Sequence, residues 1–283
     1  MRARASRPFT TFVGVDLGGG KGKNTAVALL QAKGETVRVR YVGTRTPDGE
    51  PYYDEQLIAF LLAHRDAALV AIDAPLVPTV CVRCRLPECV GLGACEDRVV
   101  RWFRERGDPL VRGQDAGGPN GKPATTPYTQ RACEVVLQRE HGITPRETLG
   151  QGMGPLTARA HYLRRALERH FRLNANLIEV YPKATVHALF SADRARRYKR
   201  EVDTWRTRAE LLEELSHSLR FEVWREGCLS NDHCFDAVLC AYTGYLWATE
   251  GWTLPERDRE VFEDDGWIWF PPPAGERGAI SGP

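Results

Sequence analysis

The chain has 283 residues, of which 42% are hydrophobic and 27% are charged, and it contains eight Cys. This composition excludes global disorder and a collagen-like fibre. The longest apolar runs, such as LIAFLLA and ALVAI, are far shorter than the roughly 20 residues that a membrane-spanning helix needs, so no membrane association is expected. The N-terminal segment is basic and lacks the apolar stretch of a secretory signal, which predicts a cytoplasmic location with reduced thiols.

The near-neutral charge of the chain is unevenly distributed. From Arg159 to Arg208 there are 13 Lys and Arg against 5 Asp and Glu, an excess of +8, and the remainder carries 26 basic and 32 acidic side chains. Such asymmetry is typical of a protein face that meets a polyanion, and equally of a solvated helix surface.

The first third of the sequence predicts three strands, a helix and a strand. TTFVGVDL and TAVALLQ are short apolar runs, and TVRVRYVGT alternates strictly, as a strand with one wet face does. DEQLIAFLLAHR has an acidic first turn and helical apolar spacing, and AALVAIDAP reads as a buried strand that Pro75 ends.

Residues 77–155 interrupt this pattern with a segment rich in Cys, Gly and Pro, in which EDRVVRWFRERG and TQRACEVVLQREHG are predicted helices. Strand and helix patterns then return through ANLIEVYP to the helix NDHCFDAVLCAYTGYLWATE. We therefore expect a core formed by residues 10–76 and 156–250, an insertion at 77–155 without a core of its own, and a C-terminal tail at 251–283.

The predicted order is β-β-β-α-β-α-β-α, which defines an α/β fold with a mixed sheet flanked by helices. An antiparallel hairpin set followed by right-handed crossovers is the layout of the ribonuclease H-like architecture, which the actin-like ATPases share.

Acidic residues follow the predicted core strands. Asp16 ends the first strand and Asp73 ends the fourth. Sites in α/β sheets gather at the carboxyl ends of parallel strands, and neighbouring strands lie about 4.8 Å apart. If these two strands are neighbours, both carboxylates would therefore reach one divalent cation.

Further acids accompany this pair. Glu179 lies in the apolar run LIEVYP, where a buried charge is costly without a cation or hydrogen bonds. Asp232 and Asp236 share a face of the last predicted helix, and His233 precedes Asp236 by three residues. Carboxylates on several rigid elements are what a two-metal phosphodiesterase site needs, so Mg²⁺ or Mn²⁺ is the expected cofactor.

Five ordered segments, VGVDLGGG, AIDAPLVP, PYTQRACE, IEVYPKA and DHCFDAVLCAYTGYL, resemble the family known as domain of unknown function 429, which is predicted to consist of ribonuclease H-like nucleases. The resemblance covers most of residues 12–250. It implies metal-binding roles for Asp16, Asp73, Glu179 and Asp236. It also implies that Arg131 and Glu134 project toward the site, while Asp232 and His233 remain competing ligands on the closing helix.

The glycine loop GGGKGK at residues 18–23 joins the first two predicted strands. One interpretation is a flexible turn, because Gly adopts positive φ freely. The other is a phosphate cradle that uses Lys21 and Lys23, although no Walker pattern is present. The cradle would suit an actin-like ATPase or phosphotransferase, or it would neutralise a nucleic-acid phosphate.

Four cysteines, Cys81, Cys84, Cys89 and Cys95, have the spacing C-x2-C-x4-C-x5-C within fifteen residues. Clustered thiols in a reducing compartment indicate a metal, either Zn²⁺ or an iron–sulfur cluster, with zinc slightly favoured. The insertion is therefore predicted to include a metal-binding loop that folds around its metal.

Together these features favour a metal-dependent nuclease or phosphodiesterase with nucleic acid as its partner. Basic residues of the central segment would contact phosphates: Arg164, Arg165, Arg196, Arg197, Lys199 and Arg200. Tyr198 and Trp205 lie beside these residues and would stack on bases, although aromatic residues at such positions more often pack against the protein itself. The alternatives are an actin-like ATPase or phosphotransferase and a nucleic-acid-binding protein without catalysis.

Overall fold

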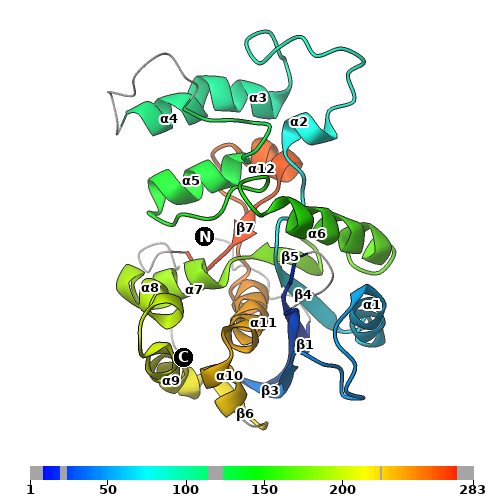
Figure 1. Cartoon of the computed structure of the whole chain (residues 1–283), viewed down its shortest axis with the longest axis vertical. Helices are drawn as coiled ribbons and strands as arrows, with labels where there is room; N and C mark the ends of the chain where they lie inside the picture. The colour runs from blue at the N-terminus through cyan, green and yellow to red at the C-terminus, as the bar shows by residue number, and fades with distance from the viewer. Residues whose placement is uncertain (1–8, 20–23, 114–123, 224, 273–283) are drawn as a thin grey trace. The chain divides into compact units, whose positions relative to one another are not determined.

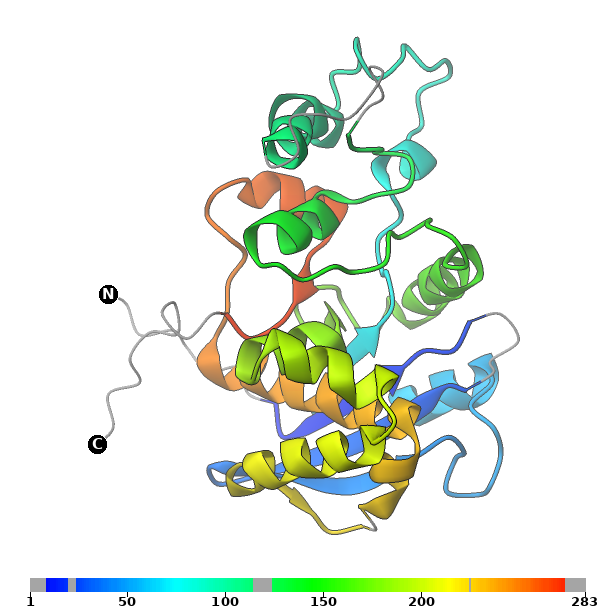
Figure 2. The same ribbon diagram turned by 60° about the vertical axis from the view of Figure 1, so that its left-hand side comes forward.

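The computed structural model describes residues 9–19, 24–113, 124–223 and 225–272 (Figures 1 and 2). The chain divides into two compact units. The first comprises Met1–Ala74, Tyr162–Trp252 and Trp269–Pro283, and the second comprises Pro75–His161 and Thr253–Ile268. The segment 253–268, assigned by sequence to a tail, thus belongs to the second unit.

A mixed sheet organises the first unit. Within the described residues it has seven strands in the order β6-β3-β2-β1-β4-β5-β7. Their bounds are Thr11–Asp16 for β1, Ala26–Lys33 for β2, Thr36–Gly43 for β3, Ala68–Asp73 for β4, Leu177–Val180 for β5, Leu219–Phe221 for β6 and Ile268–Trp269 for β7. The pairs β1–β2 and β2–β3 are antiparallel, whereas β1–β4, β4–β5 and β3–β6 are parallel. The predicted mixed sheet and α/β class are confirmed.

The strand sequences explain these positions. β1, β4 and β5 are apolar along nearly their whole length and lie in the sheet interior, as parallel strands covered on both faces do. β3 alternates, so that Val37 and Val39 are buried while Arg40 is exposed. β2 and β3 are joined by a two-residue turn in which Gly34 has φ +62°, a conformation that favours Gly.

One long helix, α11 (Asp232–Glu250), covers one face of the sheet and contacts β1, β2 and β4. It begins at Asn231, whose side chain accepts a hydrogen bond from the His233 amide, and it ends at Gly251 in the left-handed conformation. Figure 1 shows α1 (Asp54–Ala63) on the opposite face, where Leu57 and Leu61 are its buried residues.

Further helices stand beside α11 in the first unit. α7 packs on α11 and on α8, and α8 packs on α9. The bounds are Pro182–Leu189 for α7, Ala192–Arg200 for α8, Thr204–Glu214 for α9 and Glu226–Ser230 for α10. The sequence pattern missed α8 because its residues are polar on nearly every side and only Ala195 and Tyr198 are buried.

The second unit has its own buried core, where the sequence predicted none. Its helices are α2 (Val80–Arg83), α3 (Arg98–Trp102), a π-helical turn (Phe103–Gly107), α4 (Asp108–Arg112), α5 (Ala132–Glu140) and α12 (Arg259–Asp265), and α6 (Gly154–Leu167) crosses the boundary between units. Phe103, Val136 and Phe262 are buried. Buried Asp265 accepts hydrogen bonds from the Ala132 amide at 2.7 Å and from Arg83 at 3.0 Å, which ties α12 to α2 and α5. Among the described residues, every helix is too short or too polar to cross a membrane.

Candidate metal centre

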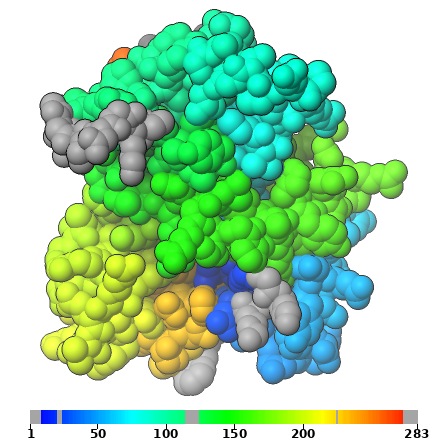
Figure 3. Space-filling view, turned by 45° about the horizontal axis from the view of Figure 1, so that its top comes forward, coloured from blue at the N-terminus to red at the C-terminus, as the bar shows by residue number. Residues whose placement is uncertain are grey.

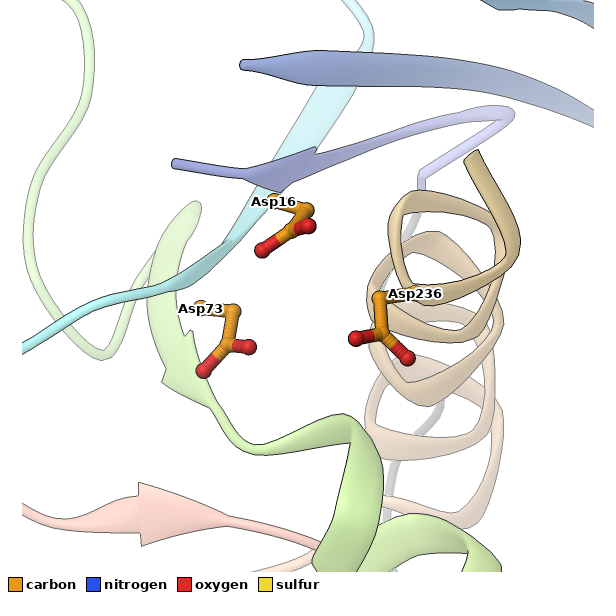
Figure 4. Close-up of side chains that lie close together, drawn as sticks. All are labelled: Asp16, Asp73 and Asp236. Atoms are coloured by element: carbon orange, nitrogen blue, oxygen red, sulfur yellow. The ribbon is translucent and has the colours of Figure 1, made fainter. Parts of the chain in front are cut away.

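Three aspartates from three elements converge at the carboxyl ends of β1 and β4. Asp16 and Asp73 are the last residues of these strands and are register partners in the parallel pair. Asp236 lies in the second turn of α11. One carboxylate oxygen of each lies within 4.8 Å of the other two, and Figure 4 shows the three side chains around a common space. No other group of three or more Asp, Glu, His or Cys side chains in the described part of the chain comes so close.

Small residues bring α11 close enough for Asp236 to complete the group. Gly14 faces the helix, and a methyl group there would lie 2.0 Å from the Ala237 carbonyl oxygen and 2.4 Å from the Ala241 amide nitrogen. The helix backbone therefore lies directly against β1, two residues before Asp16. The third carboxylate thus depends on a close approach that only Gly permits.

The electrostatics of this group favour a cation. Burial raises the pKa of Asp73 well above its ordinary value, and the charges of Asp16 and Asp236 add to the rise while Lys199 opposes it. Burial likewise raises the pKa of Asp236 to about 7, against the lowering effect of Lys199. Three carboxylates this close repel one another, and a divalent cation would relieve the repulsion.

Lys199 of α8 supplies the positive charge present at this site. Its Nζ forms an ion pair with Asp236 Oδ2. Burial lowers the pKa of Lys199, but the charges of Asp236 and Asp73 outweigh this effect and the pKa is raised. The fully buried Asp236 also interacts with the Tyr198 hydroxyl, and its two oxygens have further lone pairs for a cation. Hard oxygen ligands of this kind suit Mg²⁺ or Mn²⁺.

His233 contacts the group through Asp16, because its Nδ1 lies 2.6 Å from Asp16 Oδ2. This hydrogen bond raises the pKa of His233, burial opposes the rise, and the Asp16 charge adds to it. The side chain of His233 is 38% exposed, so the imidazole connects the carboxylates to solvent. Of the three candidates on this helix, Asp236 joins the carboxylate group, His233 contacts it, and Asp232 stays outside it.

Glu179 is buried but does not join the three aspartates. In the parallel pair β4–β5 its register partner is Ile72, the residue before Asp73. Register partners point to the same face and successive residues alternate, so Glu179 and Asp73 point to opposite faces of the sheet. Because of this one-residue offset Glu179 lies outside the group of three, and a metal-binding role for it stays a prediction, although its charge contributes to the raised pKa of Asp73.

The other predicted accessory residues are placed elsewhere or not described. Arg131 and Glu134 form a buried ion pair in the second unit, with Nε to Oε1 at 3.1 Å, and they cap the start of α5. This pairing gives both residues a structural role in that unit. Lys21 lies outside the described residues, as do Gly20, Gly22 and Lys23 of the glycine loop.

The predicted phosphate contacts differ in their availability. Arg196 and Arg197 form ion pairs with Asp193 and Glu201 of their own segment, so much of their charge is balanced locally. Arg164 and Arg165 lie in the last turn of α6. Arg200 is exposed and lines a cavity of about 460 Å³ with Arg197, Arg206 and acidic neighbours.

Lys183, in the first turn of α7, was missed by the sequence analysis. Its pKa is lowered by burial and by the nearby charges of Arg200 and Lys199. Lys183, Lys199 and Arg200 therefore form a group of cations, the positive rim, in which Lys199 contacts Asp236. Its position in YPKA could have indicated a place near the site. It lies three residues beyond the end of β5, and Asp16 and Asp73 lie at the ends of β1 and β4.

The two aromatic residues have different surroundings. Tyr198 is fully buried and packs on Phe235 with ring centroids 5.4 Å apart, so it is not available to stack on a base. Trp205 is 56% exposed and remains available.

The four loop cysteines lie in the second unit, with Cys81 and Cys95 half-buried and Cys84 and Cys89 exposed. All are free thiols, and no three of them lie within the 4.8 Å that groups the aspartates. Arg104 donates hydrogen bonds to the carbonyl of Cys95 and to two carbonyls just before it. The loop is thus fixed at its second half.

Comparison with known proteins gives one match. The model of a family described as a protein of unknown function, DUF429, matches residues 14–260 of the chain. Neither the curated proteins nor the solved structures include a significant match.

Proposed function

Since the chain belongs to the DUF429 family, whose function is unknown, we propose its activity from the site itself: it is a divalent-metal-dependent nuclease, or phosphodiesterase, of ribonuclease H-like type. The observation that carries the proposal is the convergence of Asp16, Asp73 and Asp236 within 4.8 Å, from two neighbouring strand ends and one helix.

The sheet topology supports the ribonuclease H-like assignment. The central strands run in the order β3-β2-β1-β4-β5, with an antiparallel meander followed by two parallel strands. This is the layout expected for that architecture. Acids at the ends of the first and fourth strands, completed by one from a later helix, are placed where such a fold would bind metal.

Each residue of the site has a distinct task in this proposal. Asp16, Asp73 and Asp236 would hold Mg²⁺ or Mn²⁺, which when bound activates water and stabilises the leaving oxygen of a phosphodiester. His233 orients Asp16 through its hydrogen bond and, being partly exposed, exchanges a proton with solvent.

The positive rim gives this site its preference for an anionic substrate. Lys183, Lys199 and Arg200 would contact phosphate oxygens beside the carboxylates. Because phosphate contacts are electrostatic, cleavage should weaken as the salt concentration rises. Nucleic acid is therefore the proposed substrate.

The test is a panel of labelled single- and double-stranded DNA and RNA, incubated with Mg²⁺, Mn²⁺ or EDTA. We expect metal-dependent cleavage that Asp16→Asn and Asp73→Asn abolish. Asp232→Asn is the matched control, because Asp232 lies on the same helix as Asp236 but outside the carboxylate group. Full activity of Asp73→Asn, or cleavage in EDTA, would contradict the metal mechanism.

A parallel assay of ATP hydrolysis separates the alternatives. Metal-dependent release of phosphate from ATP without cleavage of nucleic acid would favour an actin-like ATPase. Salt-dependent binding of nucleic acid with neither reaction would favour a binding protein that lacks catalysis.

A further inference from the structure

The eight cysteines of the chain occupy two kinds of environment. Four are buried, namely Cys133, Cys228, Cys234 and Cys240, as is usual for an unligated thiol that packs as a small apolar side chain. The other four are the loop cysteines of the second unit, and all of them are exposed or half-buried. Hydrophobic packing therefore does not account for the loop cysteines.

The loop that contains them has little apolar support. Residues 84–97 form neither helix nor strand. Three large apolar side chains in and before this segment face solvent, with Val82 59% exposed, Leu86 56% and Val90 57%. A segment that buries so little apolar surface has little to offset the entropy of ordering its backbone.

Neighbouring elements nevertheless hold both ends of the loop. Cys81 lies in the short helix α2, and Cys84 follows that helix directly. At the other end, Arg104 donates hydrogen bonds to the carbonyls of Leu92 at 3.1 Å, Gly93 at 2.9 Å and Cys95 at 3.2 Å. The first pair of thiols and the last thiol are thus held by neighbouring elements.

The four thiols lie in one neighbourhood of the loop. Cys81 interacts electrostatically with Cys89, Cys95 and Cys84, although no three of these thiols lie within 4.8 Å of one another. All three of the others therefore lie within electrostatic reach of Cys81.

We infer that Cys81, Cys84, Cys89 and Cys95 form a structural zinc site that closes the loop of the second unit. Four thiolates at about 2.3 Å from the ion complete a tetrahedral shell. Binding draws the exposed Cys84 and Cys89 inward, and the ion then supplies the cohesion that apolar side chains do not. Arg104, beside Cys95, offsets part of the negative charge of the tetrathiolate.

Zinc is favoured over an iron–sulfur cluster by solvent exposure. Two of the four thiols face water, as do the side chains of Val82, Leu86 and Val90. The reduction potential of an iron–sulfur cluster depends on how its sulfurs are shielded from solvent. Zinc undergoes no redox reaction, so its site does not need such shielding. An open surface loop is therefore better suited to zinc.

The test uses the full chain, purified without oxygen or chelators. Elemental analysis should give one zinc per chain, and an organomercurial that modifies thiols should release it. Cys84→Ser and Cys89→Ser should lose the zinc, whereas Val90→Ser, an equally exposed change in the same loop, should keep it. Asp73→Asn should also keep it, which separates this site from the carboxylate site.

Two further measurements follow the loop itself. Co²⁺ added to the zinc-depleted chain should give the absorption bands of a tetrahedral tetrathiolate, and Cys84→Ser should lack them. Trypsin should cleave at Arg85 faster after zinc removal. The inference is overturned if neither the purified nor the depleted chain binds zinc, or if both Ser variants keep it. Stoichiometric iron with acid-labile sulfide would overturn the choice of zinc.

Discussion

Asp16 and Asp73 end neighbouring parallel strands at the same level of the sheet, as register partners. Their carboxylates, with that of Asp236, repel one another in a buried place that Lys199 neutralises only in part. Such an arrangement costs stability, which is typical of a site that serves binding rather than folding.

Replacing one of these carboxylates should stabilise the metal-free protein while abolishing its response to metal. For Asp73→Asn in EDTA at pH 8 we expect the free energy of unfolding to rise by about 1–2 kcal/mol, because burial and two like charges disfavour the ionised form. Thermal unfolding with EDTA, Mg²⁺ and Mn²⁺ measures this. The assignment of Asp73 as a metal ligand would be contradicted if the variant were less stable than the wild type in EDTA, or if Mg²⁺ stabilised both proteins equally.

The metal-free protein should be more stable in mild acid than above neutral pH. Asp236 has an ordinary pKa of 3.8 in the unfolded chain and about 7 in the folded one, so the folded state binds the proton more tightly. Its contribution is complete below pH 4 and is lost as the pH rises to about 7, at up to about 1.4 kcal/mol per pH unit for one proton.

Urea unfolding in EDTA between pH 4.5 and 8.5 tests this dependence. Asp73, Lys199 and His233 titrate together with Asp236, and the charge of Asp16 acts on all four, so the slope belongs to the group. Asp236→Asn should flatten the profile between pH 5 and 7. An unchanged slope in that variant would show that other groups cause it.

The sequence predicted the sheet better than it predicted the site. The apolar runs of β1, β4 and β5 and the alternation of β3 specify strands locally, and the acids that end two of them were visible. Glu179 shows the limit of such a pattern. LIEVYP is apolar on both sides of the acid, so it does not reveal which face Glu179 occupies, and a one-residue register decides it.

Lys199 illustrates a second limit. Its basic segment indicated contacts with phosphate, but it gave no sign that the helical phase of α8 and its packing on α7 bring this lysine to Asp236. The core of the second unit was missed for a similar reason, since Phe262 of α12 is more than 150 residues from α3 in sequence and the two helices pack together. Long-range packing of this kind leaves no local pattern.

Removing the Lys199 ammonium should make the site depend more strongly on metal. In EDTA at pH 8 we expect Lys199→Met to lower the free energy of unfolding by about 1–3 kcal/mol. This loss is smaller than the roughly 3–5 kcal/mol for breaking a fully buried ion pair, because the Lys199 side chain is 34% exposed and solvent screens its charge. Mn²⁺ should restore more stability to this variant than to the wild type, since the ion no longer competes with the ammonium.

The control for this change is Arg196→Met, because Arg196 is an exposed cation of the same helix that pairs with Asp193. Its replacement should leave the free energy of unfolding nearly unchanged, because solvent screens this ion pair. Calorimetric titration with Mn²⁺ gives the affinities directly. If Lys199→Met and the wild type bound Mn²⁺ with equal affinity, the ammonium and the metal would not share the site.

A methyl group at Gly14 should disrupt both the fold and the site, because it would meet the α11 backbone at the Ala237 carbonyl and the Ala241 amide. Backbone atoms of a packed helix do not move easily, so we expect Gly14→Ala to lower the free energy of unfolding by about 3 kcal/mol or more.

Gly244→Ala is the matched control on the same interface. Its methyl group would lie 2.5 Å from Leu69 Cδ2, the end of a flexible side chain that can rotate, so a loss of about 1 kcal/mol is expected. Urea unfolding gives both values, and the Mn²⁺ affinity of the folded fraction shows whether the shift of α11 also displaces Asp236. Equal stability of the two variants would mean that α11 does not approach β1 as closely as the site requires.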